Sequence, residues 1–326
     1  MKRSTLLIGL AGCVGRALGL LIALLAASGV WSAVAHAATP RPRVALVTDL
    51  QPVRIAKSGA YSTAVAILPA RGDAPVRIVA GDQRGGLIVV RRGRDGRFGR
   101  FVRRNDIDIH ALAVADLDGD GRDDLVSGGS PGDDGLAASV RWGGRGGRLG
   151  KARRLGMPAL EGGAAAWVNE LRVADVDGDG RRDIVTANLV GGSNPRPGAG
   201  VAVLHNRGHR RFALTTPTTL RSGEDLAVAD LNGDGRRDLF VNGRAYLRRS
   251  NGRFVAGRRH GDHVVNFSEL ADLDADGRAD LLYSLNQRLV VRHGARRGFG
   301  ESDGFAWPQR DGLKWPHLAL VDVLLG

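Results

Sequence analysis

The stretch of sequence that decides the fold runs from residue 114 to residue 126 and reads VADLDGDGRDDLV. Its acidic side chains stand at positions 1, 3, 5 and 9 of a loop, at Asp116, Asp118, Asp120 and Asp124. A tight loop turns alternate side chains to one side, and Gly121 at position 6 permits the sharp turn. Apolar residues flank the loop on both sides, as in strands. The stretch therefore predicts a β-hairpin whose loop gathers carboxylate oxygens.

Three more copies of this stretch follow in the same register. They read VADVDGDGRRDIV from Val173, VADLNGDGRRDLF from Val228 and LADLDADGRADLL from Leu270. The copies lie about 40 to 60 residues apart, which is the size of a four-stranded propeller blade. The residues Phe98, Leu149, Phe212, Phe254 and Phe299 are expected to open the fourth strands and fill the gaps between blades.

Two weaker copies bracket these four. AILPARGDAPVRIV from Ala66 keeps Asp73 but has Pro69 and Arg71 in place of the first two acids, and LALVDVLLG from Leu318 ends the sequence. The fold class predicted is therefore all-β, a β-propeller of four-stranded blades, with six blades expected and seven as the alternative. We expect the strand-like segment 43–55 and the C-terminal strand to share one blade, because closure protects sheet edges.

The four loops predict metal centres. Their expected ligands are Asp116, Asp118, Asp120, Arg122, Asp124; Asp175, Asp177, Asp179, Arg181, Asp183; Asp230, Asn232, Asp234, Arg236, Asp238; and Asp272, Asp274, Asp276, Arg278, Asp280, the arginines through their backbone carbonyls. Carboxylates this close repel one another without a cation, and hard oxygen donors in this number suit Ca²⁺. About four Ca²⁺ ions are expected.

Two other interpretations of the loops are disfavoured. An EF-hand needs a glutamate at position 12, where the sequence has Ser127, Thr186, Val241 and Tyr283. A plain polar turn explains one Asp-Gly pair but not four copies in one register.

The aspartate loops resemble the FG-GAP/VCBS repeats, similar to those in the N-terminal propeller of integrin α subunits. The resemblance covers about residues 60–326, and the Phe-Gly element survives as Phe98-Gly99 and Phe299-Gly300. It implies an extracellular β-propeller whose calcium ions stabilise the blade hairpins. It does not imply a particular ligand.

The N-terminal region has the features of an export signal. Lys2 and Arg3 precede an apolar stretch at 18–30, and Ala35-His36-Ala37 fits a cleavage site. We expect a signal peptide at 1–37, a propeller domain at 38–326, and a secreted, cell-surface or periplasmic location. A lipobox at Cys13 and an uncleaved anchor are the alternatives. Cys13 is the single cysteine, so the mature protein has none.

A ligand surface is predicted on the rim opposite the acidic loops, where the first strands begin. Its candidate residues are Asp108, His110, Trp167, Asn169, Glu170, Glu224, Asp225, Glu269, Trp315 and His317. Tryptophans beside carboxylates suit a sugar or a cationic peptide group. An ordinary solvated rim is the alternative.

These features favour a binding, adhesion or structural module that acts on an extracellular glycan or protein as a monomeric domain. The alternative is a secreted polysaccharide-active enzyme, a lyase or hydrolase, although no catalytic residue is assigned. The net charge of +13 also permits binding to anionic polymers, but the sequence has no nucleic-acid motif or Lys/Arg run, and no nucleic-acid partner is expected. The tripeptide Arg71-Gly72-Asp73 is attributed to composition.

Overall fold

The computed structural model describes residues 4–12, 20–26, 62–82, 86–93, 98–105, 109–130, 138–157, 166–190, 197–260, 268–274, 278–285, 288–295, 298–306 and 315–323, with residues 95 and 276. Apart from η1 (Arg145–Gly147), a single 3-10 turn, these residues form strands, turns and loops. Within these ranges no helix has the length and apolar character needed to cross a membrane.

Five four-stranded antiparallel sheets follow one another along the described part of the chain. The first holds β3 (Ser62–Leu68), β4 (Arg77–Asp82), β5 (Gly86–Arg92) and β6 (Phe98–Asn105). The second holds β7 (Ile109–Ala115), β8 (Asp124–Gly129), β9 (Ala138–Arg141) and β12 (Arg153–Arg154), with the small pair β10 (Gly143–Gly144) and β11 (Arg148–Leu149) beside it. The third holds β13 (Ala166–Ala174), β14 (Asp183–Val190), β15 (Val201–Asn206) and β16 (Phe212–Thr215). The fourth holds β17 (Ala227–Ala229), β18 (Asp238–Val241), β19 (Arg244–Arg248) and β20 (Phe254–Arg259). The fifth holds β21 (Ser268–Ala271), β22 (Asp280–Leu285), β23 (Arg288–Ala295) and β24 (Gly298–Ala306).

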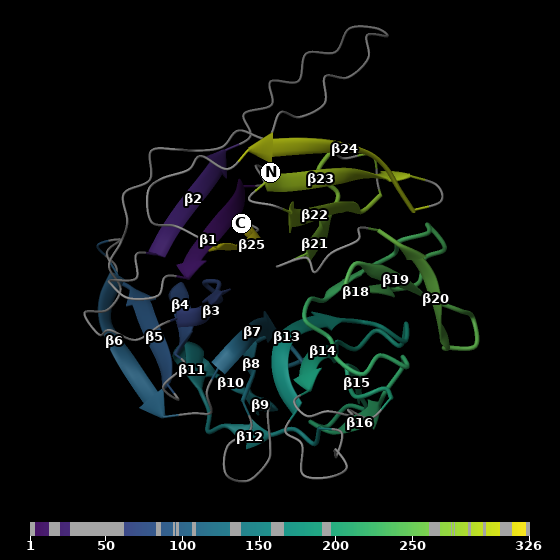
Figure 1. Cartoon of the computed structure of the whole chain (residues 1–326). Coiled ribbons are helices and arrows are strands. Elements are labelled where there is room, and N and C mark those ends of the chain that lie inside the picture. The colour runs from purple at the N-terminus through teal and green to yellow at the C-terminus, as the bar shows by residue number, and fades with distance from the viewer. Residues whose placement is uncertain are drawn as a thin grey trace, which may run out of the picture.

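Spatial order follows chain order within each sheet, and consecutive strands pair, except that β9 pairs with β12 across the inserted β10–β11 pair. Each acidic loop joins the first strand to the second, as the hairpin pattern predicts. Figure 1 shows the sheets side by side around a common centre, with the first strands innermost. The prediction of an all-β chain of four-stranded sheets is therefore confirmed. The number of blades and the closure of the ring stay predictions.

Apolar side chains fill the spaces between neighbouring sheets. Val126 and Val140 of the second sheet share one buried cluster with Val168 and Leu171 of the third, and Phe212 packs against it. Phe240 of the fourth sheet meets Phe299 of the fifth edge to face, with ring centroids 6.0 Å apart. These phenylalanines fill the gaps between sheets as expected.

One expectation about the fourth strands is wrong for the second sheet. Leu149 does not open the fourth strand there but lies in β11, and β12 takes the fourth position four residues later. The cause is the Gly-rich segment 143–147, which forms the β10–β11 pair and η1 before the chain returns to β9. Leu149 is still buried, against Leu68 and Val79 of the first sheet.

A further sheet joins the two ends of the chain in the order β2 (Leu20–Ala26), β1 (Ser4–Gly12) and β25 (Trp315–Val323). β1 runs antiparallel to β25, with Ser4 opposite Val323 and Gly12 opposite Trp315. The segment 43–55, predicted to share a blade with the C-terminus, lies outside the described residues. The signal peptide and the boundary at residue 38 stay predictions.

Candidate metal centres

The first acid of each loop holds the loop's own backbone. Asp116 accepts hydrogen bonds from the backbone N–H groups of Gly119 and Gly121, each at 2.8 Å, and of Asp120 at 3.1 Å. Asp175 and Asp230 accept the same set in their loops. The glycine at position 6 makes this turn possible, because it takes a φ of 79° to 83° in the first three loops.

The ninth acid ties the loop to the third strand. Asp124 accepts the N–H of Leu117 at 2.9 Å through one oxygen and that of Gly143 at 2.6 Å through the other. Asp183, Asp238 and Asp280 make the equivalent pair of bonds, and all four carboxylates are buried. Each carboxylate oxygen still has lone pairs for a cation.

The fifth acid pairs with the arginine two residues on. The distances are 2.5 Å for Asp120 and Arg122, 3.0 Å for Asp234 and Arg236, and 2.6 Å for Asp276 and Arg278, and Asp179 pairs with Arg181 in the same way. The sequence assigned these arginines a role only through their carbonyls. Their partly exposed guanidinium groups also neutralise one carboxylate in each loop.

Donor atoms converge in three of the loops. Asp116, Asp118 and Asp124 bring oxygens within 4.8 Å of one another, as do Asp175, Asp177 and Asp179, and then Asp272, Asp274 and Asp276. Oxygen donors grouped this closely are suited to a divalent cation. The four predicted sets of residues therefore lie in four like hairpin loops, and three of them show converging carboxylates.

The ninth acids of the first and third loops carry poorly compensated charge. Burial raises the pKa of Asp124 to about 6, backbone hydrogen bonds oppose the rise, and Asp118 and Asp120 add to it. Burial likewise raises the pKa of Asp238 to about 6, with Asp230 and Asp234 adding to the rise. A bound cation would relieve both penalties, so these residues fit a metal site.

Two histidines complete the second and fourth clusters, and sequence reasoning missed both. His205 Nδ1 lies 3.3 Å from Asp177 Oδ2 and 3.6 Å from Asp183 Oδ2. His293 Nδ1 lies 3.4 Å from Asp274 and 3.7 Å from Asp280. Burial raises the pKa of Asp183, but hydrogen bonds from His205 and two backbone N–H groups outweigh it, and the pKa is lowered overall.

The loops also hold neighbouring sheets together. Asn206 of the third sheet donates to the carbonyl of Leu117 in the second sheet's loop at 2.6 Å. Arg210 reaches the same loop, where its Nε lies 2.8 Å from Asp118 Oδ2 and its guanidinium stacks 4.6 Å from the Trp142 ring. This loop thus lies against the hairpin that joins the third and fourth strands of the next sheet.

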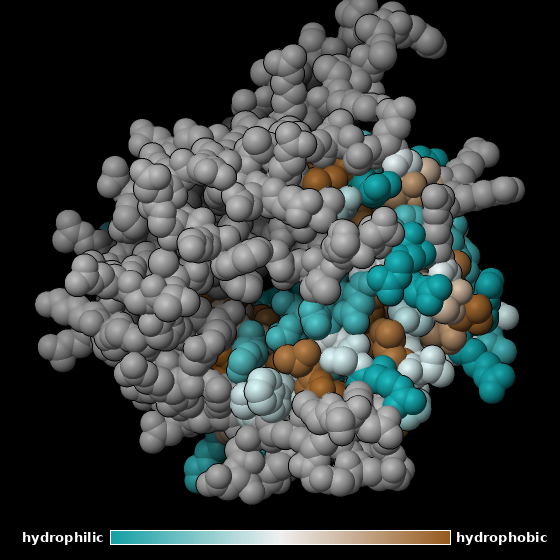
Figure 2. Space-filling view, in the orientation of Figure 1, coloured by the Kyte–Doolittle hydropathy of each residue, from teal (hydrophilic) through white to brown (hydrophobic). Residues whose placement is uncertain are grey.

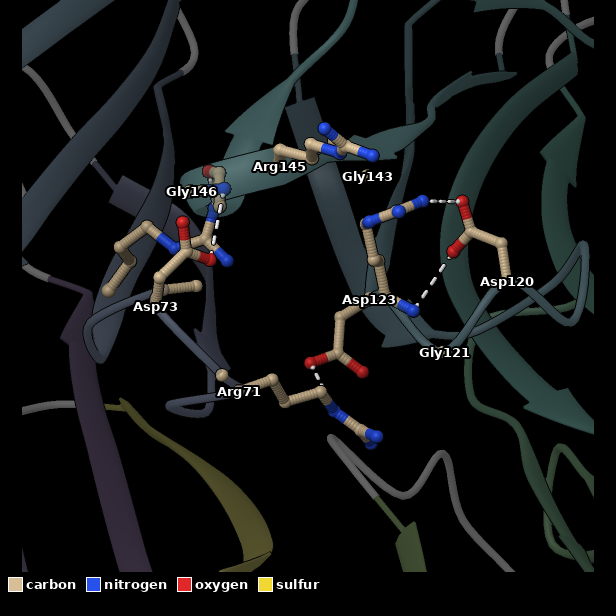
Figure 3. A pocket seen from close by; sticks show the side chains of 14 residues that line it. Arg71, Asp73, Asp120, Gly121, Asp123, Gly143, Arg145 and Gly146 are labelled. Atoms are coloured by element: carbon tan, nitrogen blue, oxygen red, sulfur yellow. Dashed lines mark hydrogen bonds and ion pairs between the residues drawn. The ribbon is translucent and has the colours of Figure 1, made fainter.

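The degenerate loop of the first sheet keeps this contact without its acids. Arg71 Nε lies 2.9 Å from Asp123 Oδ2, and Asp73 accepts the N–H of Gly146 at 3.3 Å (Figure 3). A cavity of about 390 Å³ lies between this loop and the second sheet. The Arg71-Gly72-Asp73 tripeptide is therefore engaged within the protein itself.

Some of the predicted rim residues come together on adjacent sheets. Trp167 is 42% exposed, and Asn169 donates to the carbonyl of Glu224. Glu170 pairs with Arg172 at 2.7 Å. Figure 2 shows hydrophilic and apolar residues mixed around the centre of one face, where side chains are described.

Other predicted rim residues contribute differently. Asp225 is buried and accepts the backbone N–H of Asn242, which makes it part of the fold rather than of an open surface. His110 Nε2 lies 3.3 Å from Ser130 Oγ. Asp108 lies outside the described residues, and for Glu269, Trp315 and His317 only the strand positions are described.

Comparison with known families decides what these loops are. The model of the FG-GAP-like repeat matches residues 116–186 and 175–241. The chain contains FG-GAP-like repeats. Each match begins at the first aspartate of one loop and extends beyond the next loop, so the family pattern covers the hairpins and the seam between sheets. No curated protein matches the sequence.

A solved propeller structure lies among the matches. The Dos1 propeller has a TM-score of 0.50 and 13% identity over 79% of this chain and 62% of its own. The Vibrio cholerae biofilm matrix protein Bap1 has a TM-score of 0.47 and 20% identity over 76% of this chain and 40% of its own. The chain thus spans less than two thirds of either relative. The likeness to Dos1 shows the propeller fold alone.

Proposed function

We propose that this chain is an extracellular β-propeller that needs Ca²⁺ for stability and acts as a binding module for a glycan or a protein. The observation that carries the proposal is the converging carboxylates of the FG-GAP-like loops. Three carboxylates converge in each of three loops, and one arginine pairs with the fifth acid of each loop. Oxygen donors in this number favour Ca²⁺ over Mg²⁺, which keeps its waters.

The position of the loops supports a structural role for the ion. Asn206 and Arg210 bind the loop of the preceding sheet, so a rigid loop also fixes the boundary between two sheets. A cation that organises Asp118 and Asp124 therefore acts on two sheets together. A chain with one cysteine has no internal disulfide to do this work.

The ligand surface that we propose is the rim around Trp167, on the side of the sheets away from the loops. The indole is exposed, Asn169 of the same strand donates to the carbonyl of Glu224 just before the fourth sheet, and Glu170 pairs with Arg172. An exposed aromatic beside hydrogen-bonding groups suits a sugar ring or a cationic peptide group. The extracellular location rests on the export features at 1–37, which also favour a calcium-rich environment.

The test combines metal analysis with a ligand screen. We expect the purified chain to bind about four Ca²⁺ ions and to lose at least about 10 °C in Tm when they are chelated. A glycan array, with and without chelator, should give signals that need Ca²⁺. Trp167→Ala should abolish these signals, whereas Leu214→Ala, at a similarly exposed outer-strand residue, should not.

Two results would contradict the proposal. A chain that holds no Ca²⁺ and melts equally with and without chelator would remove the metal role. Ligand binding that survives Trp167→Ala would remove the rim as the binding surface.

A further inference from the structure

One position at the end of the third strand carries a histidine beside the acidic loop in two of the four repeats. It is the residue just before the one whose N–H binds the ninth acid. The four occupants are Trp142, His205, Leu247 and His293. The repeats therefore offer two copies with a nitrogen donor at this position and two copies without one.

The geometry of His205 is that of a ligand. Its side chain is 14% exposed, and its Nδ1 lies 3.3 Å from Asp177 Oδ2 and 3.6 Å from Asp183 Oδ2. Donor atoms at about 2.0 to 2.2 Å from a tetrahedral Zn²⁺ lie about 3.3 to 3.6 Å from one another. The two distances from His205 Nδ1 thus match the spacing that such an ion requires, and all three donor atoms lie within 4.8 Å of one another.

The contacts of His205 direct its Nδ1 at the carboxylates. Nε2 lies 3.1 Å from Thr215 Oγ1, and this contact holds the ring in that orientation. In the metal-free chain His205 is a hydrogen-bond and charge partner of Asp183, while Oδ1 of Asp177 is buried without a hydrogen-bond partner among the described residues. A divalent ion bound here would take the place of a proton on Nδ1 and give the Asp177 oxygen a partner.

We propose that His205, Asp177 and Asp183 form a site for a divalent transition-metal ion such as Zn²⁺, and that His293, Asp274 and Asp280 form a second. Imidazole nitrogen suits transition ions, whereas Ca²⁺ takes oxygen. The repeat at His293 supports the assignment, since its Nδ1 stands 3.4 and 3.7 Å from the two equivalent carboxylates. The FG-GAP-like loops of this chain are then of two kinds, which differ in one third-strand residue.

The guanidinium of Arg207 competes with an ion for the His205 site. Arg207 Nη1 lies 3.4 Å from Asp177 Oδ2, but its side chain is 50% exposed. It can therefore turn to solvent when an ion binds.

The test uses the full chain, stripped of metal and dialysed against Zn²⁺ in the presence of millimolar Ca²⁺. We expect about two Zn²⁺ ions to stay bound. The double variant His205→Leu/His293→Leu places leucine at both positions, as Leu247 already stands in the repeat of the third loop. It should lower Zn²⁺ affinity at least about 100-fold while Ca²⁺ binding persists. His209→Leu, at an exposed histidine of a nearby turn, is the matched control and should keep Zn²⁺.

Cobalt gives a second readout of the same site. Co²⁺ in the Zn²⁺ position should show a visible absorption spectrum that the double variant loses and His209→Leu retains. Retained Ca²⁺ binding and an unchanged melting profile show that the double variant is folded.

The inference shares Asp177 and Asp183 with the calcium proposal, and the outcomes separate the two. Calcium binding without Zn²⁺ binding overturns this inference alone, as does Zn²⁺ binding that the double variant leaves unchanged. Failure of both ions to bind overturns this inference together with the calcium role.

Discussion

Single carboxylates decide how the loops respond to pH. Asp124 and Asp238 are buried, have ordinary hydrogen bonds to backbone N–H groups, and yet have pKa values raised to about 6. Asp183 makes the same backbone bonds, but His205 stands beside it and its pKa is lowered. His205 therefore helps to compensate the buried charge of Asp183.

A pH dependence follows for the calcium-free chain. Because the folded-state pKa of Asp124 and Asp238 exceeds the ordinary value of 3.8, the folded chain binds more protons between about pH 4 and pH 6. The free energy of unfolding in chelator should therefore increase from about pH 7.5 to about pH 5, by about 1 to 1.5 kcal/mol per carboxylate. Saturating Ca²⁺ should remove this increase. Urea unfolding at both pH values measures it.

The control for this prediction is Asp124→Asn/Asp238→Asn, which cannot ionise and should flatten the profile. Asp183 and Asp234 have lowered pKa values, so they affect stability only at lower pH. Their contribution to the free energy of unfolding is lost as pH falls through their folded pKa. A calcium-free chain that loses stability from about pH 7.5 to about pH 5 would contradict the prediction.

The spacing of residues within a loop was enough to predict the carboxylate clusters. Positions 1, 3, 5 and 9 are close in sequence, so their convergence is a local property of the turn. His205 and Arg210 come from strands and hairpins tens of residues away, and only the sheet register brings them to Asp177 and Asp118. In each repeat, one third-strand residue donates its backbone N–H to the ninth acid. A search of the position just before that residue would have found the two histidines.

At the scale of elements, the second strand of one sheet lies against the first strand of the next. A Cβ on Gly128 of β8 would stand 2.3 Å from Val168 Cγ1 of β13, and one on Gly81 of β4 would stand 2.5 Å from Ile109 Cγ2 of β7. Glycine at these places lets two sheets approach at the inner part of the ring. The close approach is a property of the packed pair and not of either strand alone.

Gly128→Ala should therefore destabilise the chain by about 1 to 3 kcal/mol, because Val168 has to move from a well-packed position. Adding Val168→Ala should recover part of the loss. Gly99→Ala, in the exposed outer strand β6 where the nearest atom is 3.8 Å away, serves as the control and should change stability little. Chemical denaturation of the four proteins measures this, and an unaffected Gly128→Ala would contradict the close packing.

The order of strands was predictable because each hairpin has its own turn residues and apolar alternation. The β10–β11 pair was not, since glycines at 143, 144, 146 and 147 allow several turns and carry no apolar pattern. The observed turn is in contact with the first sheet, since Arg77 of β4 donates to the carbonyl of Gly147.

For the whole molecule, the two ends of the chain decide whether the predicted ring can close. The sheet β2-β1-β25 uses strands that lie within the predicted signal peptide. Removal of residues 1–37 would leave β25 without β1, and we then expect the segment 43–55 to take its place.

The number of thiols in the exported protein shows whether the signal peptide has been removed. The exported protein should begin at Ala38 and contain no cysteine, since Cys13 is the only one in the chain. N-terminal sequencing and thiol titration of protein recovered outside the cell measure both. One thiol per chain, or an N-terminus before residue 13, would contradict the cleavage.

The acidic loops lie where one sheet meets the next, and this has a consequence for transport across a membrane. With calcium scarce, as in the cytoplasm, the repelling carboxylates would leave every such boundary weak, and the polypeptide would stay loose enough to be threaded through a translocation channel. Millimolar calcium outside the cell would then stabilise these boundaries between sheets one after another. On this view the ion acts as a compartment-sensitive trigger for assembly of the ring.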